Sequence, residues 1–102
     1  MKIFLDTANV ELVRKLFPTG LVDGITTNPT LIRKSGAEPY DVYSELEQLG
    51  VKDISMEVTG GVTQMYDDAQ HLIYRFGDIA TIKLPMTSDG LLVCRQLNQQ
   101  QV

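Results

Sequence analysis

The feature that most constrains the fold is a regular alternation of short apolar runs with helical patterns, repeated four times in 102 residues. Each run is followed by a segment whose apolar residues recur at helical spacing. The predicted strands are Ile3–Leu5, Gly24–Asn28, Ile54–Val58 and Ile79–Leu84. Strands that alternate with helices in this way favour a parallel sheet with right-handed crossovers. We therefore predict an α/β fold, with no linker or charged block dividing the chain.

Residues typical of helix ends flank the helical segments. The candidates for helix starts are Asn9, Pro29, Thr63, and Thr87 or Ser88. The candidates for helix ends are Gly20, Gly36, Gly50 and Gly77. Side-chain oxygens of Asn and Thr satisfy free amides at helix starts, proline fits the first turn, and glycine adopts the backbone that ends a helix. These signals separate the predicted helices from the predicted strands.

Charge and cysteine content argue against several classes of partner. The net charge is -4 with no basic block, so nucleic acid and anionic membranes are poor candidates. The chain has no run of about 18 apolar residues that could span a membrane. A single cysteine and a single histidine exclude an internal disulfide and argue against a zinc site. The lone Cys94, and an acid as early as Asp6, lead us to expect a cytoplasmic protein.

Strand periodicity places a set of polar residues on one face of the predicted sheet. Successive side chains of a strand point to opposite faces, and the apolar faces suit the covering helices. The other face carries Asp6, Asn28, Glu57 and Lys83, each near the carboxyl end of its strand. The carboxyl ends of adjacent parallel strands form the edge where α/β proteins bind ligands. We therefore expect these four side chains to converge.

Each of these residues also has an ordinary structural interpretation. Asp6 could cap the first helix, and Asn28 could form a turn before Pro29. Glu57 and Lys83 could be solvated charges. Lys83 weighs against this interpretation because it interrupts an apolar run, where a charged ammonium is costly unless it is paired or neutralised. The joint pattern therefore favours a functional site.

The four groups fit the chemistry of a Schiff base. A neutral lysine amine attacks a ketone, and the protonated imine then accepts electrons from a breaking carbon–carbon bond. Asp6 could remove a hydroxyl proton, and Glu57 could relay protons through water. Asn28 could hold the substrate by amide hydrogen bonds. This chemistry needs no metal.

Four segments also resemble a known family. They are FLDTAN (Phe4–Asn9), GITTNPTL (Gly24–Leu31), EVT (Glu57–Thr59) and IKLPMT (Ile82–Thr87). They resemble the transaldolases, most closely the short subfamily that also contains fructose-6-phosphate aldolases, and the resemblance covers essentially the whole chain. It implies a (βα)8 TIM-barrel aldolase that uses a lysine Schiff base and no cofactor. It also implies transfer of a dihydroxyacetone unit between sugar phosphates of the pentose phosphate pathway.

The resemblance assigns roles residue by residue. Lys83 matches the Schiff-base lysine, Asp6 the acid/base of the first strand, and Glu57 the acid that works through a water. The positions that line the site by this match are Asn28, Thr26 and Ser55. The related aldolases carry glutamine at the place of Glu57. Because glutamine cannot shuttle a proton, Glu57 favours a transaldolase over an aldolase.

The chain is short for this family. An eight-stranded barrel takes about 250 residues, and the short subfamily fewer. We therefore expect residues 1–102 to form a single (βα)4 domain, the N-terminal half of a (βα)8 barrel truncated relative to the family. The arginine that binds phosphate in the family lies in its later strands. Lys2, Arg14, Arg33 and Lys34 do not match it, and we expect Arg33 and Lys34 on a solvated face.

A half barrel leaves two sheet edges open. Two copies could pair edge to edge with two-fold symmetry and close an eight-stranded ring, so we expect a homo-oligomer. Three functions remain open. The first is a transaldolase-like enzyme, with fructose-6-phosphate aldolase-type cleavage as its nearest alternative. The second is a catalytically silent half barrel that serves as an assembly module. The third is a small-molecule binder that forms the imine without turnover.

Overall fold

Four parallel strands lie side by side in chain order in the computed structural model, which describes all residues 1–102. The strands are β1 (Phe4–Asp6), β2 (Gly24–Thr26), β3 (Ile54–Glu57) and β4 (Ala80–Lys83). The helices are α1 (Val10–Leu16), α2 (Pro29–Ser35), α3 (Pro39–Gln48), α4 (Val62–Phe76) and α5 (Ser88–Gln99). The predicted alternation of strands and helices is confirmed. Strand β4 is shorter than predicted, because Ile79 belongs to a 3-10 turn, Gly77–Ile79.

Three of the predicted helix starts are made by side-chain caps. The Oδ1 of Asn9 accepts the Leu12 amide at 3.2 Å, and the Oγ1 of Thr87 accepts the Gly90 amide at 3.0 Å. Asn28 caps α2 in the same way, and Pro29 occupies its first turn. The interpretation of Thr63 as a cap is wrong. Helix α4 begins at Val62, which packs against the core, so Thr63 is already helical and Gly61 holds the cap position.

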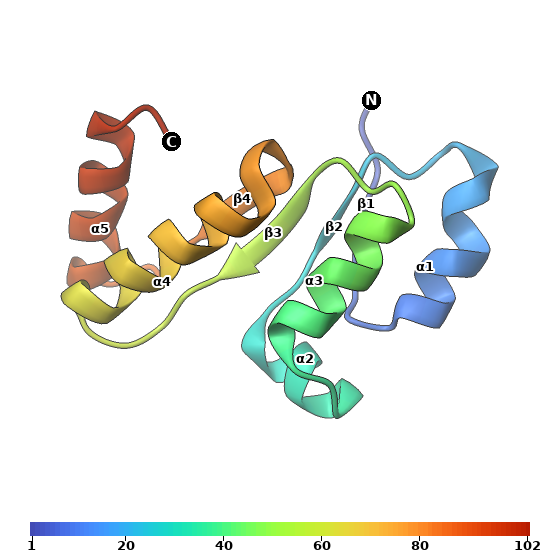
Figure 1. The fold of residues 1–102 in the computed structure, drawn as a ribbon, viewed down its shortest axis with the longest axis horizontal. Coiled ribbons are helices and arrows are strands. Elements are labelled where there is room, and N and C mark those ends of the chain that lie inside the picture. The colour runs from blue at the N-terminus through green and yellow to red at the C-terminus, as the bar shows by residue number, and fades with distance from the viewer.

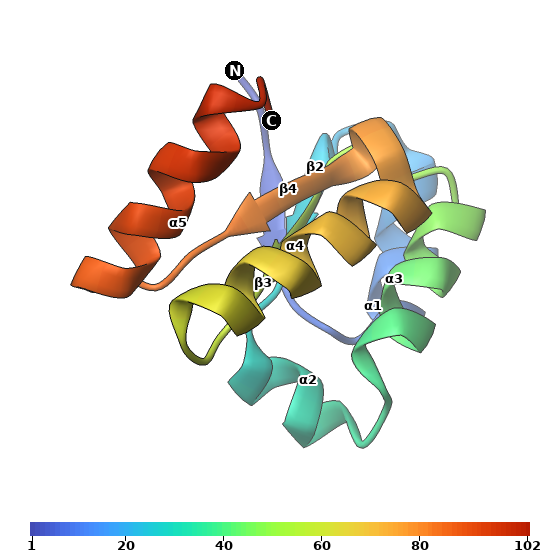
Figure 2. The ribbon, with the colours of Figure 1, turned by 60° about the vertical axis from the view of Figure 1, so that its left-hand side comes forward.

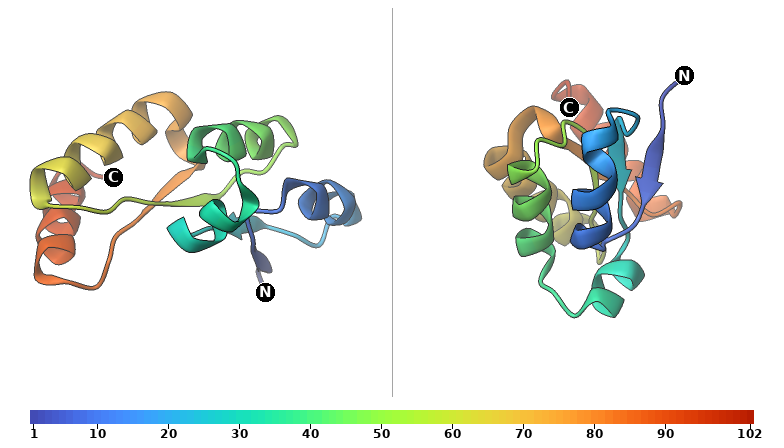
Figure 3. Two further views of the ribbon diagram at one scale, coloured as in Figure 1. Left: turned by 90° about the horizontal axis from the view of Figure 1, so that it is seen from below. Right: turned by 90° about the vertical axis from the view of Figure 1, so that its right-hand side faces the viewer.

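The helices cover one face of the sheet. Helices α3 and α4 lie in front of the strands in Figure 1, with α1 at their right and in contact with α3, and the left panel of Figure 3 shows α3 and α4 on the same side of the sheet. Helix α5 packs against α4, and α2 lies apart at the carboxyl ends of the strands. The core between the sheet and the helices holds 17 buried apolar residues. Ile25, Ile54 and Met56 are fully buried there.

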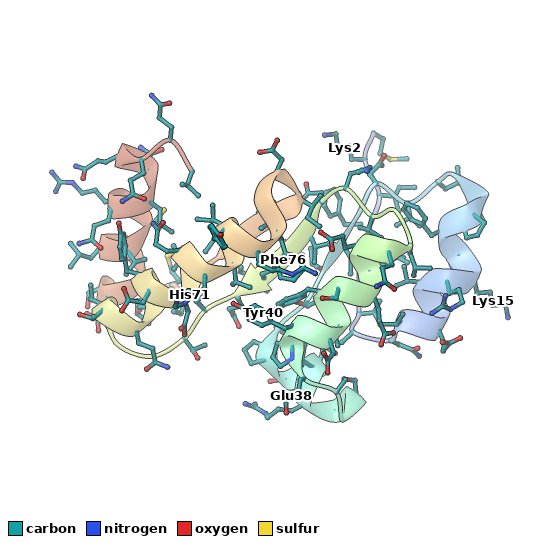
Figure 4. The ribbon with its side chains drawn as sticks, viewed as in Figure 1. Lys2, Lys15, Glu38, Tyr40, His71 and Phe76 are labelled. Carbon is teal, nitrogen blue, oxygen red and sulfur yellow. The ribbon has the colours of Figure 1, made fainter.

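Contacts between α3 and α4 fix the middle of the helical layer. Tyr40 and Phe76, labelled in Figure 4, have ring centroids 5.8 Å apart, and Tyr43 meets the Phe76 ring edge-on with centroids 5.9 Å apart. The Arg75 guanidinium stacks over Phe76 at 4.5 Å and binds Glu47 at 3.2 Å. These contacts hold α3 and α4 against each other.

The opposite face of the sheet has no covering layer, and only 20 of the 102 residues are buried. Phe4 and Thr81 are exposed on this face. Strands β1 and β4 each pair on one side only, and Figure 2 shows β4 at the edge, followed by α5. The fold is thus four βα units of a TIM-barrel-type sheet, open at both edges. None of the helices is long and apolar enough to cross a membrane.

Candidate active site

The strand register aligns the polar residues in two rows on the uncovered face. Asp6 pairs with Thr26, Thr26 with Ser55, and Ser55 with Thr81. Glu57 and Lys83 are partners in the next row towards the carboxyl ends. Their strand neighbours Ile54 and Met56 point into the core on the other face. The face assignment predicted from periodicity is therefore correct for β3.

Asp6 is hydrogen-bonded to a residue of the adjacent strand and does not cap a helix. Its Oδ1 accepts the hydroxyl of Thr26 at 2.9 Å. Asn9 caps α1, so the alternative that Asp6 serves as a helix cap is wrong. The carboxylate is exposed on the open face and keeps its second oxygen for another partner. Thr26 is therefore placed to orient Asp6.

Lys83 extends across the sheet from β4 towards β2. Its Nζ lies 3.5 Å from the backbone oxygen of Thr27, and it forms no ion pair with Glu57, since no oxygen of Glu57 comes within 4 Å. Lys83 is half-buried, not enclosed as its apolar run suggested, because nothing in the chain covers this face. An amine with one long hydrogen bond is available to react once it loses its proton.

A cavity of about 620 Å³ lies at the carboxyl ends of the strands, beside α2. Three of the predicted site residues line it: Asp6, Asn28 and Glu57. The other lining residues are Pro29, Thr30, Leu31, Arg33 and Thr59. Lys83 does not line this cavity but is the register partner of Glu57, which does. The structure thus places Asn28, Glu57 and Lys83 at the carboxyl edge, with Asp6, Thr26 and Ser55 in the row beneath.

Asn28 caps α2 and also lines the cavity. Its Oδ1 accepts the Leu31 amide at 2.9 Å and so caps α2. This bond uses the acceptor of the side-chain amide and leaves its Nδ2 donor for a ligand in the cavity. The cap also fixes the orientation of that donor, because both ends of the hydrogen bond belong to the same helix start.

Thr27, which the sequence reasoning did not single out, connects the site to the core. Its side chain is fully buried, and its Oγ1 donates to the Ser55 backbone oxygen at 2.8 Å. Burial raises the pKa of the Tyr43 hydroxyl, the Thr27 side chain offsets part of that rise, and the Glu57 charge adds to it. Tyr43 therefore stays neutral beneath the site. The apolar pattern of α3 could have predicted that Tyr43 is buried, but it could not have predicted that Tyr43 lies near Glu57.

The fold and these side chains together define a class of protein. Parallel βα units whose polar residues gather at the carboxyl ends of the strands are typical of TIM-barrel-type proteins. Residues 3–102 match the family model described as Transaldolase/Fructose-6-phosphate aldolase. The chain belongs to this family, as the four motifs of the sequence predicted.

Relatives with curated names agree with this assignment. The chain is 42% identical over 103 residues to a "Probable transaldolase" of Nitrosopumilus maritimus, covering 100% of this chain and 46% of that protein. It is 39% identical over 105 residues to one of Thermoplasma volcanium, covering 100% and 47%. It is 41% identical over 100 residues to one of Brucella ovis, covering 98% and 46%. The chain thus spans about half the length of the curated relatives it matches.

Proposed function

We propose that the chain forms a Schiff base through Lys83 and transfers a dihydroxyacetone unit between sugar phosphates, as a transaldolase of the pentose phosphate pathway. The observation that carries this proposal is the convergence of one amine and two carboxylates near the carboxyl edge of the sheet. Lys83 and Glu57 are register partners, and Asp6 shares the cavity with Glu57. Family membership supports the same reaction type.

In the proposed reaction, the neutral Nζ of Lys83 attacks the ketone carbon of the donor sugar phosphate. The carbinolamine loses water and becomes a protonated imine. Asp6 then takes the proton of the hydroxyl on the second carbon from the imine carbon. The bond between that hydroxyl-bearing carbon and the carbon next to the imine carbon breaks. The departing fragment leaves as an aldehyde, and the electron pair of the broken bond forms an enamine on Lys83. Attack of that enamine on an acceptor aldehyde, with return of the proton from Asp6, reverses the sequence.

Glu57 and Asn28 have supporting roles in this proposal. The formation and loss of the carbinolamine both require proton transfers near the Lys83 nitrogen. Glu57, in the adjacent strand and in register, can make these transfers through a water molecule. The Nδ2 of Asn28 can donate to a substrate hydroxyl, since its Oδ1 is already used. Thr26 fixes Asp6 for proton abstraction.

Glu57→Gln tests the proton relay. The variant keeps the shape and hydrogen-bonding capacity of the side chain but cannot carry a proton. We expect imine formation, followed by trapping with borohydride, to slow by about 10²-fold or more. Glu45→Gln, at an exposed position of α3, is the matched control and should leave the rate unchanged. Equal rates for both variants and the parent chain would remove Glu57 from the mechanism.

Two alternatives remain in the proposal. In fructose-6-phosphate aldolase-type cleavage, the enamine is protonated to an imine, and water then hydrolyses that imine to release dihydroxyacetone and free the Lys83 amine. Glu57 favours transfer by the family resemblance, because the related aldolases carry glutamine there. The open edges of β1 and β4 favour the second alternative, a silent half barrel that serves as an assembly module. The borohydride adduct separates this module from either enzyme.

We also propose that residues 1–102 fold as one (βα)4 unit whose edges are covered by a second copy of the same chain. The four strands are parallel, so a rotation about the strand direction places β4 of one copy beside β1 of the other in the parallel sense. Exposed apolar side chains flank both edges. They are Ile3, Leu12 and Leu21 near β1, and Met86, Leu91 and Leu92 near β4.

The single cysteine also supports a cytoplasmic location for the chain.

Sedimentation velocity of the chain at micromolar concentration tests this pairing. We expect a dimer, because the edge hydrogen-bonding groups and the flanking apolar residues are otherwise left to water. Leu91→Glu should weaken dimerisation by at least about tenfold, since it places a charge on the α5 flank of the β4 edge. Tyr74→Glu, at a position that is 93% exposed on α4, should leave the dimer intact. A compact, folded monomer would refute the pairing.

A further inference from the structure

Thr27, the residue that follows β2, is the only fully buried threonine of the chain. Its hydroxyl donates to the backbone oxygen of Ser55 at 2.8 Å. The register of β2 with β3 ends one residue earlier, where Thr26 pairs with Ser55. The buried hydroxyl therefore extends the link between the two strands beyond their ladder, at the level where both segments reach the site.

The residues on either side of Thr27 belong to the site. Thr26 donates to Asp6 at 2.9 Å, and Asn28, whose Oδ1 is held by the start of α2, lines the cavity. The Nζ of Lys83 has one hydrogen-bond acceptor, the backbone oxygen of Thr27, at 3.5 Å. Three successive residues thus serve the site, and the buried hydroxyl anchors the middle one.

The contact between Lys83 and Thr27 is long, so it directs the amine more than it stabilises the fold. A lysine side chain has a flexible stem, and its amine must be held near the ketone carbon for efficient attack. Hydrogen bonds in unliganded sites are often long and tighten when the substrate binds. The Thr27 oxygen can give a constant direction because its peptide is fixed to β3 through the hydroxyl.

We propose that Thr27 is the positioning residue of Lys83, because its buried hydroxyl fixes the backbone oxygen that directs the amine across β3. The same segment carries the Thr26 hydroxyl that holds Asp6 and the Asn28 amide at the cavity. One anchor thus sets the positions of the nucleophile and of the proton acceptor relative to each other. The proposal rests on the proposed function for the chemistry of the amine, whereas the direction of the side chain can be measured without it.

The rate of borohydride trapping with dihydroxyacetone tests this role. Thr27→Val keeps the branching of the side chain but removes its hydroxyl, so we expect the rate per folded molecule to fall at least about tenfold. Thr27→Ser keeps the hydroxyl and should restore most of the rate. Ser35→Ala is the matched control and should leave the rate unchanged, because it removes another part-buried hydroxyl, one that donates to the Ile32 backbone oxygen. Circular dichroism measures the folded fraction of each variant.

Nuclear Overhauser contacts distinguish this role from a purely structural one. In the parent chain we expect a contact between the ε-methylene of Lys83 and the amide of Asn28, which shares a peptide with the Thr27 oxygen. The contact should persist in Thr27→Ser and disappear in Thr27→Val. If Thr27→Val does not fold, Thr27→Cys takes its place with the same expectation, since a thiol is a weak donor. An unchanged contact, or its absence from the parent chain, would overturn the proposal.

Failure of the proposed function gives a different result. If the parent chain forms no adduct, the transfer reaction is refuted, but a contact present there and lost in Thr27→Val would still support the positioning of the Lys83 side chain. If Thr27→Val and the parent chain form the adduct at the same rate per folded molecule, the positioning role is refuted and the proposed function stands.

Discussion

Replacing Lys83 by methionine is expected to abolish the borohydride-trapped adduct with dihydroxyacetone and to leave the fold nearly unchanged. Methionine removes the amine that forms the imine, so no covalent product can form. It retains an unbranched apolar side chain at a half-buried position. The hydrogen bond that is lost, to the Thr27 backbone oxygen, is 3.5 Å long and contributes little. Intact-protein mass spectrometry measures the adduct, and circular dichroism measures the fold.

A second lysine provides the control for this experiment. Lys52 is exposed and precedes β3, outside the polar face, so Lys52→Met should keep the full adduct. An adduct that persists in Lys83→Met would show that another amine reacts and would refute the mechanism. An adduct absent from the parent chain would favour the assembly module. Adduct formation without sugar transfer would identify a binder.

Local rules of sequence predicted the elements and the face of the site. Asn9 and Thr87 were recognisable as caps because short polar side chains satisfy free amides at helix starts. Strand periodicity then separated Glu57 from Met56 without any knowledge of the fold. Thr63 was misassigned because the packing of Val62, a tertiary effect, moves the start of α4.

The remaining features of the site depend on distances between elements that no local pattern encodes. Arg33 looks like any surface cation in the sequence, and only the placement of α2 beside β1 and β3 brings it to the cavity. Thr27 likewise joins three elements through its hydroxyl and its backbone oxygen. In the sequence, the one available signal for Thr27 was its position within the TTNP segment, and Arg33 had none.

The partial exposure of Lys83 connects the assembly to the chemistry. A lysine becomes a nucleophile at neutral pH when desolvation or a nearby cation favours its neutral form. In the open sheet, water reaches the face that carries Lys83, Glu57 and Asp6. A second copy that closes the ring would remove that water, and the desolvation would favour the neutral form of the amine. On this proposal the dimer is the reactive form, and Leu91→Glu should lower the trapping rate together with dimerisation.

The other large effect concerns Gly90, where we expect alanine to lower the free energy of unfolding by about 3 kcal/mol. Alanine in a helix ordinarily stabilises it by up to about 1 kcal/mol relative to glycine. At Gly90, however, an added Cβ would lie 1.9 Å from the backbone oxygen of Pro85. That oxygen belongs to the segment between Lys83 and α5, so relief of the clash must move α5 or the end of β4. Urea denaturation followed by circular dichroism at fixed chain concentration measures the loss.

Gly61→Ala is the matched control for this prediction. Gly61 precedes α4 with a φ of -79°, which alanine adopts freely, and an added Cβ there meets nothing within 4 Å. We expect its free energy of unfolding to change by less than about 1 kcal/mol, since only the preference at the cap position differs. Comparable stability of Gly90→Ala and the parent chain would contradict the close approach of α5 to Pro85. A large loss in Gly90→Ala alone would support it, and a weaker adduct in that variant would show that the same contact places Lys83.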